Sequence, residues 1–93
     1  MKILQSRSFE KKTRRFNKAQ KKELDKQVEL IVNDPYVGIE KKGDLRGIYV
    51  HKFKIKTVQY LLAYRFINEN LELIMIGPHE NYYRDLKKYV KNK

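Results

Sequence analysis

The sequence contains no cysteine and no tryptophan, and among its 93 residues there are only two histidines and two prolines. Without cysteine the chain has neither disulfides nor thiolate metal ligands, so packing must supply its stability. No clustered His or carboxylate set, G-x-S-x-G element, H-E-x-x-H element or glycine-rich phosphate loop is present. These absences argue against metal-dependent and covalent hydrolysis, and we expect no metal and no cofactor.

Long hydrophobic runs are also missing. The longest, residues 60–64 and 73–77, are about a quarter of the roughly 20 residues that cross a bilayer. The first seven residues turn polar after Ile3 and Leu4, so they lack the apolar stretch of a secretory signal. We therefore expect a cytoplasmic protein with no membrane segment.

Hydrophobic residues make up 41% of the chain and charged residues 35%, a composition too apolar for a disordered chain. A chain of this length has room for one hydrophobic core, so residues 1–93 are expected to form a single domain.

The charge balance is the strongest compositional signal, because 22 Lys and Arg against 11 Asp and Glu give a net charge of +11. Such a field attracts anionic partners. Nucleic acid, an acidic membrane surface and an acidic protein all fit, and composition does not choose among them.

Apolar spacing predicts two helices in the first third of the chain. After a short apolar segment at residues 3–5, Ser6 or Ser8 is placed to cap a short basic helix that turns Phe9, Thr13 and Phe16 inward. A longer helix is predicted from Lys18 to Asn33. Its buried face would hold Leu24, Val28 and Ile31, widened by Leu30 and Val32.

Residues 36–47 are expected to form a connecting loop that is anchored by Leu45. Beyond it, β-branched and aromatic residues alternate with polar ones, which predicts strands at about 49–56, 59–67 and 71–76. Short links make them an antiparallel meander, and a final helix is predicted over 80–89. The fold class is therefore α+β with element order βααβββ and a tail helix. The sheet packs on the two N-terminal helices, which leaves its other face partly open.

Alternation along the first long strand separates two sets of side chains. His51 falls with Phe53 on the core side, where it is expected to be a partly buried structural residue. Lys52 and Lys54 fall on the uncovered face. Simple solvation or protection of a sheet edge would explain such lysines equally well.

His79 follows Gly77-Pro78 at the exit of the last strand, a corner from which its side chain can overhang the lysines. Its role is either proton transfer near neutral pH or that of an ordinary surface histidine. Of Tyr82 and Tyr83, one is expected to pack inward and the other to face out, where a phenol can stack on a base or position a phosphate.

A basic face flanked by a histidine and a tyrosine suits RNA cleavage without metal. The ribose 2′-OH attacks the adjacent phosphorus, so the site must accept a proton, stabilise negative charge and neutralise the leaving oxygen. A similar surface without chemistry would only bind phosphates, and the residues themselves do not separate the two cases.

Three segments of the sequence resemble the RelE/ParE superfamily of bacterial toxins, and the resemblance covers nearly the whole chain. The segments are GDLRGIYVHKFK (43–54), YLLAY (60–64) and IGPHENYYRDL (76–86). The resemblance implies a toxin of a type II toxin–antitoxin pair that a small acidic antitoxin neutralises. The RelE-like branch cleaves mRNA in the ribosomal A site, whereas the ParE-like branch poisons DNA gyrase.

The resemblance also assigns roles to individual residues. Lys52 and Lys54 match paired basic strand residues that act on the phosphate, and His79 stands where relatives place a basic or histidine catalytic residue. Tyr83 is the counterpart of an aromatic residue that stacks on the substrate, with Tyr82 as the alternative. Arg46 would contact ribosomal RNA or a substrate phosphate.

The chain departs from the pattern at Leu61, where relatives often have an arginine that stabilises the transition state. Arg65 lies on the same face by alternation, about 13 Å farther along the strand, and is a candidate to replace it. The required cation is therefore Lys54, Arg46 or Arg65. The sequence and the resemblance together favour a toxin that is a metal-independent endoribonuclease and cleaves mRNA on the ribosome. Two alternatives stay open: a gyrase inhibitor without chemistry, and a basic nucleic-acid-binding module.

Overall fold

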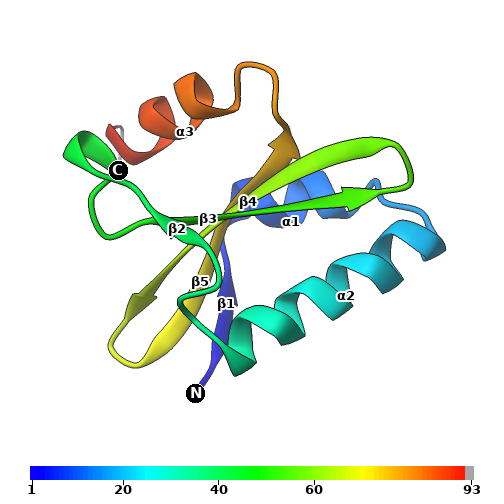
Figure 1. The fold of residues 1–93 in the computed structure, drawn as a ribbon, viewed down its shortest axis with the longest axis horizontal. Helices are drawn as coiled ribbons and strands as arrows, with labels where there is room; N and C mark the ends of the chain where they lie inside the picture. The colour runs from blue at the N-terminus through cyan, green and yellow to red at the C-terminus, as the bar shows by residue number, and fades with distance from the viewer. Residues whose placement is uncertain (92–93) are drawn as a thin grey trace.

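The structure, a computed structural model, describes residues 1–91. One five-stranded sheet lies at its centre, with helices on both faces (Figure 1). The elements are β1 (Ile3–Gln5), α1 (Arg7–Thr13), α2 (Lys18–Asn33), β2 (Ile39–Glu40), the 3-10 turn η1 (Gly43–Leu45), β3 (Tyr49–Ile55), β4 (Val58–Ile67), β5 (Asn70–Pro78) and α3 (Tyr82–Lys91). The predicted α+β class and element order are confirmed, with β2 added.

Side-chain caps determine where the two N-terminal helices begin. The Ser6 hydroxyl accepts a hydrogen bond from the Phe9 N–H at 3.0 Å. Of the two predicted caps of α1, Ser6 is therefore the N-cap residue. Helix α2 begins with a reciprocal capping box, in which Asn17 and Gln20 each accept from the other's backbone N–H at 2.8 Å. The bounds of α2 agree with the prediction.

The strand order is β1-β5-β4-β3-β2. Strands β3, β4 and β5 form the predicted antiparallel meander, whereas β1 pairs with β5 in parallel, so the sheet is mixed. Strand β2 lies within residues 36–47, the segment that was predicted to be only a loop. It pairs with the start of β3. Its two residues are too few to produce the alternation from which strands are predicted.

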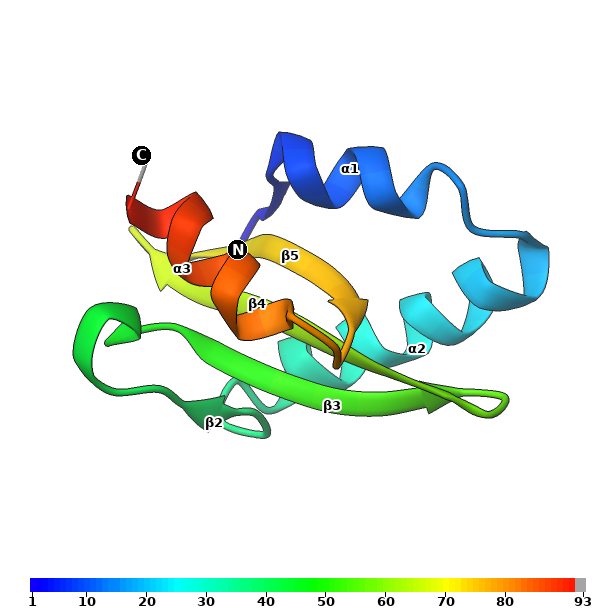
Figure 2. The same cartoon turned by 90° about the horizontal axis from the view of Figure 1, so that it is seen from above.

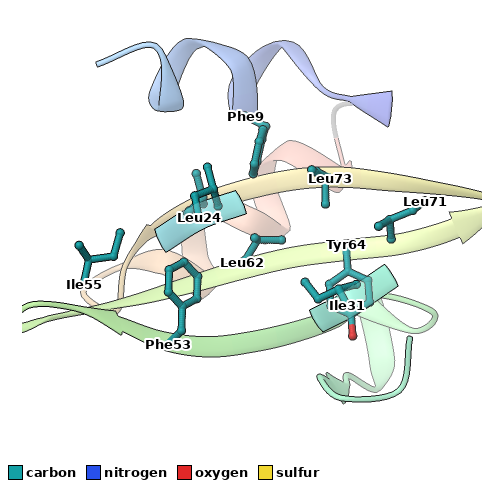
Figure 3. Packing of buried hydrophobic residues seen from close by; sticks show 10 residues of the cluster. Phe9, Leu24, Ile31, Phe53, Ile55, Leu62, Tyr64, Leu71 and Leu73 are labelled. Atoms are coloured by element: carbon teal, nitrogen blue, oxygen red, sulfur yellow. The ribbon is translucent and has the colours of Figure 1, made fainter. Parts of the chain in front are cut away.

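The first core cluster fills the space between the sheet and the helices α1 and α2. Phe9 from α1 and Leu24 and Ile31 from α2 meet side chains of β3, β4 and β5 (Figure 3). The sheet contributes Phe53, Ile55, Leu62, Tyr64, Leu71, Leu73 and Ile76. The expectation that Leu30 widens the buried face of α2 was wrong, because Leu30 is 47% exposed. It lies six residues after Leu24, and at about 100° per residue that spacing turns its side chain away from the sheet.

The second core cluster lies on the opposite face of the sheet, beneath α3. Figures 1 and 2 show α3 and α2 on opposite sides of the strands. Leu86 and Tyr82 of α3 are buried there together with Leu45 of η1, which is the predicted anchor of its loop. The other members are Ile48, Val50, Leu61, Ala63 and Ile74. The face that was expected to be partly open is therefore covered by α3 over much of its area.

Candidate functional site

Lys52 and Lys54 lie on the face of the sheet that α3 covers, but at the end that it leaves uncovered. Val50 precedes them on the same face and is buried in the second cluster, whereas both lysines are exposed. In the register, Lys52 lies opposite Leu61, which in turn lies opposite Gly77, and Lys54 lies opposite Gln59. The predicted placement of the two lysines on one accessible face is confirmed.

His79 comes directly after β5, at the same end of the sheet. On β4, Gln59 pairs with Lys54 of β3, and the next residue, Tyr60, pairs with Pro78 of β5. Pro78 comes one position before His79. The His79 side chain is exposed. Strand pairing therefore brings the end of β3, which carries the lysines, and the exit of β5, which carries His79, to one edge of the molecule.

The turn after His79 brings α3 back over the sheet. Asn81 adopts a positive φ of 58°, a conformation that asparagine tolerates better than most residues. The Tyr82 N–H donates to the His79 carbonyl at 3.2 Å, which closes the turn. This geometry places the first residues of α3 directly beside His79.

The two adjacent tyrosines at the start of α3, Tyr82 and Tyr83, have different environments, as predicted. Tyr82 is 3% exposed, and its hydroxyl donates to the Met75 carbonyl at 2.7 Å. Burial raises the pKa of Tyr82 above its ordinary value. The Tyr82 side chain therefore belongs to the core and presents no open ring face on which a base could stack.

Tyr83 is half-buried and reaches the site. Its ring lies edge-to-face with the His79 ring at a centroid separation of 6.2 Å, and edge-to-face with Tyr82 at 5.7 Å. The contacts hold an aromatic surface next to the imidazole, where a nucleobase can stack.

Leu61, the departure from the superfamily pattern, is fully buried in the second cluster together with Tyr82. Its position in the register is between Lys52 and Gly77. An apolar side chain at this point fills the core under the start of α3 and provides no cation, so any positive charge in this row comes from Lys52.

The two arginines proposed as substitutes differ in their surroundings. Arg65 is four residues beyond Leu61 on β4 and forms an ion pair with Glu72, with 2.6 Å between its Nε and the carboxylate oxygen. Arg46 is exposed at the end of η1. The register therefore separates Arg65 from the rows of Lys52 and Lys54, and its charge is already engaged.

His51 has the structural role that the sequence indicated. Its Nε2 lies 2.7 Å from the Gln27 side-chain oxygen, and its ring stacks on Phe53 with 5.8 Å between centroids. Burial lowers the pKa of His51 below its ordinary value, which favours the neutral ring.

One residue of this region was missed. Lys41, just after β2, places its ammonium 4.9 Å from the centroid of the Tyr83 ring. Residues 36–47 are rich in charge and glycine, and no spacing rule links a loop lysine to a tyrosine on a helix 42 positions later. The pairing of β2 with β3 and the packing of α3 on the same face of the sheet bring the two residues together.

The described residues lack two features that would point to another class of site. Within residues 1–91, no group of three or more His, Asp or Glu side chains is placed to hold a metal ion. In that same part of the chain, no helix is long and apolar enough to cross a membrane.

The arrangement of elements is that of a known class of small bacterial toxins. The intact E. coli RelBE toxin–antitoxin complex contains a chain that superposes with a TM-score of 0.67 at 21% identity, covering 85% of this chain and 96% of that one. A free E. coli RelE double mutant gives 0.72 at 20% identity, covering 98% and 95%. A YoeB/ParE toxin from Agrobacterium tumefaciens gives 0.67 at 19% identity, covering 85% and 99%.

The family to which the chain belongs is shown by its amino-acid sequence. The sequence model described as the ParE-like toxin of type II bacterial toxin-antitoxin systems matches residues 3–87. The chain belongs to this family of toxins. A search of curated protein sequences gives no significant match.

Proposed function

We propose that the chain is a metal-independent endoribonuclease toxin that cleaves mRNA on the translating ribosome in the cytoplasm. The observation that carries the proposal is that Lys52 and Lys54 lie at the edge of the sheet where His79 leaves β5, with Tyr83 against the imidazole. These are the groups that transesterification requires, namely cations for the phosphate and a proton-transfer group.

In the proposed mechanism the exposed lysines bind the scissile phosphate and stabilise the charge that develops on it. Tyr83 stacks on a neighbouring base and so orients the 2′-OH for attack on phosphorus. The His79 imidazole takes the proton of the 2′-OH as that oxygen bonds to phosphorus, and gives a proton to the 5′-oxygen as the P–O5′ bond breaks. With Leu61 buried, Lys52 and Lys54 take the part of the missing arginine.

We also propose that a cognate acidic antitoxin neutralises the toxin. The family belongs to toxin–antitoxin systems, and a RelE-like fold occurs in a complex with its antitoxin in the E. coli RelBE structure. The net charge of +11 suits an acidic partner as well as RNA.

The nuclease proposal is tested by single-turnover cleavage of mRNA on purified, programmed ribosomes. We expect the double variant Lys52→Gln/Lys54→Gln to cleave at least about 10²-fold more slowly than the unsubstituted chain. The matched control is Lys22→Gln/Lys26→Gln, which removes the same charge from exposed positions on α2. Equal cleavage by the two double variants would contradict the proposal.

A second candidate is inhibition of DNA gyrase by binding alone, which the ParE-like family description and the buried Leu61 favour. This function would need no proton transfer. Joint substitution of Lys52, Lys54 and His79 would then leave growth arrest intact and mRNA uncut, whereas the nuclease proposal expects the triple variant to lose toxicity.

A further inference from the structure

Lys41 differs from the other cationic side chains in its surroundings. Among the lysines and arginines of residues 1–91, all are exposed except Lys41 and Arg65, which are half-buried. The ion pair with Glu72 accounts for Arg65. In the described part of the chain no carboxylate lies within ion-pair distance of Lys41, and the contact of its ammonium is the Tyr83 ring, 4.9 Å from the centroid.

The backbone holds Lys41 in this position. Its N–H donates to the Ile48 carbonyl at 2.9 Å, which extends the pairing of β2 and β3 by one residue. Residues opposite each other in such a pair point to the same face, and Ile48 is buried in the second cluster. The Lys41 side chain is therefore on the face that α3 covers, beside a tyrosine that packs against that same cluster.

The Tyr83 ring therefore contacts both the Lys41 ammonium and the His79 ring, and 6.2 Å separates the centroids of the His79 and Tyr83 rings. A cation over an aromatic ring is attracted to it, so the contact favours the ring position in which it is made. An ammonium without a carboxylate partner is also available to form an ion pair with an anion from outside the protein. One RNA nucleotide offers both complementary groups, a base that stacks on the ring and a phosphate that pairs with the ammonium.

We propose that Lys41 is a substrate-positioning residue that holds the Tyr83 ring in place for a nucleobase and binds a phosphate of the same RNA strand. The inference rests on the proposed nuclease function. It adds to that site a residue from the β2–β3 connection, which comes before the lysines of β3 in the chain.

The test compares Lys41→Met, which keeps the aliphatic stem and removes the charge, with Lys42→Met at the exposed neighbouring position. With purified chain and programmed ribosomes, we expect Lys41→Met to raise KM about 5- to 10-fold and to change kcat about twofold or less. Lys42→Met should change both quantities about twofold or less. Lys41→Arg should restore most of the KM, since guanidinium also stacks on aromatic rings.

A double-mutant cycle tests whether Lys41 acts through Tyr83. In a Tyr83→Leu background, Lys41→Met should have less than half of the effect on KM that it has in the unsubstituted chain. An undiminished effect would overturn the positioning role.

Equal kinetics for Lys41→Met and Lys42→Met, with normal cleavage by the unsubstituted chain, would overturn the inference and leave the nuclease proposal intact. Absence of cleavage by the unsubstituted chain would overturn the nuclease proposal itself, and this inference with it.

Discussion

At the scale of single residues, burial separates the side chains that are proposed to act on substrate from those that pack beneath them. His79 and the two lysines are exposed, whereas Leu61 and Tyr82 beside them belong to the core. Substitutions at the first set should change activity with little effect on folding, whereas substitutions at the second set should lower the stability of the fold.

His79→Ala is predicted to slow single-turnover cleavage by about 10²-fold or more, because proton transfer by a placed side chain contributes at least this much. Its exposed position implies a change in unfolding free energy of about 0.5 kcal/mol or less. Glu80→Ala, at the exposed neighbouring position, is the control. A cleavage rate equal to that of the control would remove His79 from the mechanism.

Leu61→Ala is predicted to destabilise the fold by about 2–5 kcal/mol, since it removes a fully buried side chain and leaves a cavity under α3. Leu30→Ala makes the same chemical change at a position that is 47% exposed, and should cost about 0.5 kcal/mol or less. Urea denaturation of both variants measures the difference. Similar losses would show that Leu61 is not a core residue.

His51 predicts a dependence of stability on pH. Burial lowers the pKa of His51 in the folded state, so as the pH falls the unfolded chain binds this proton first. Stability should therefore fall as the pH drops below the ordinary histidine pKa of about 6.5, until the folded pKa is passed. His51→Gln should reduce this slope in urea titrations between pH 7 and pH 5, and an unchanged slope would assign it to other groups.

At the scale of elements, the site depends on α3 being held against the sheet. Leu86 is fully buried in the second cluster, and Tyr83 lies one turn before it on the same helix. Leu86→Ala is predicted to lower the hydrogen-exchange protection of α3 and to reduce cleavage, while α2 keeps its protection. Lys87→Ala is the exposed neighbouring control. Unchanged protection in α3 would show that Leu86 does not hold the helix.

Most elements could be predicted from sequence because each has a strong local signal. The spacing of Leu24, Val28 and Ile31 defines α2, and the alternation around Phe53 defines β3 and the exposure of its lysines. Strand β2 has only two residues, and its place is determined by pairing with β3. The partner of Lys41 could not be predicted for the same reason, because that contact depends on tertiary pairing.

At the scale of the whole molecule, the net charge of +11 supplies long-range attraction to polyanions, and in the proposed mechanism the lysines of the site supply the local contacts. Binding of single-stranded RNA should weaken steeply as salt increases. The variant Lys52→Gln/Lys54→Gln should reduce the slope of log K against log salt by about 0.7 for each phosphate contact that is lost. An unchanged slope in a binding titration would place the bound RNA elsewhere on the surface.

The most direct measurement is induced expression of the chain in bacterial cells, followed by mapping of new 5′ ends on translated and untranslated copies of one reporter mRNA. A ribosome-dependent nuclease predicts new ends on the translated copy alone, and their loss in the His79→Ala variant. Growth arrest with both copies of the mRNA intact would contradict the central claim and identify the chain as an inhibitor of another target.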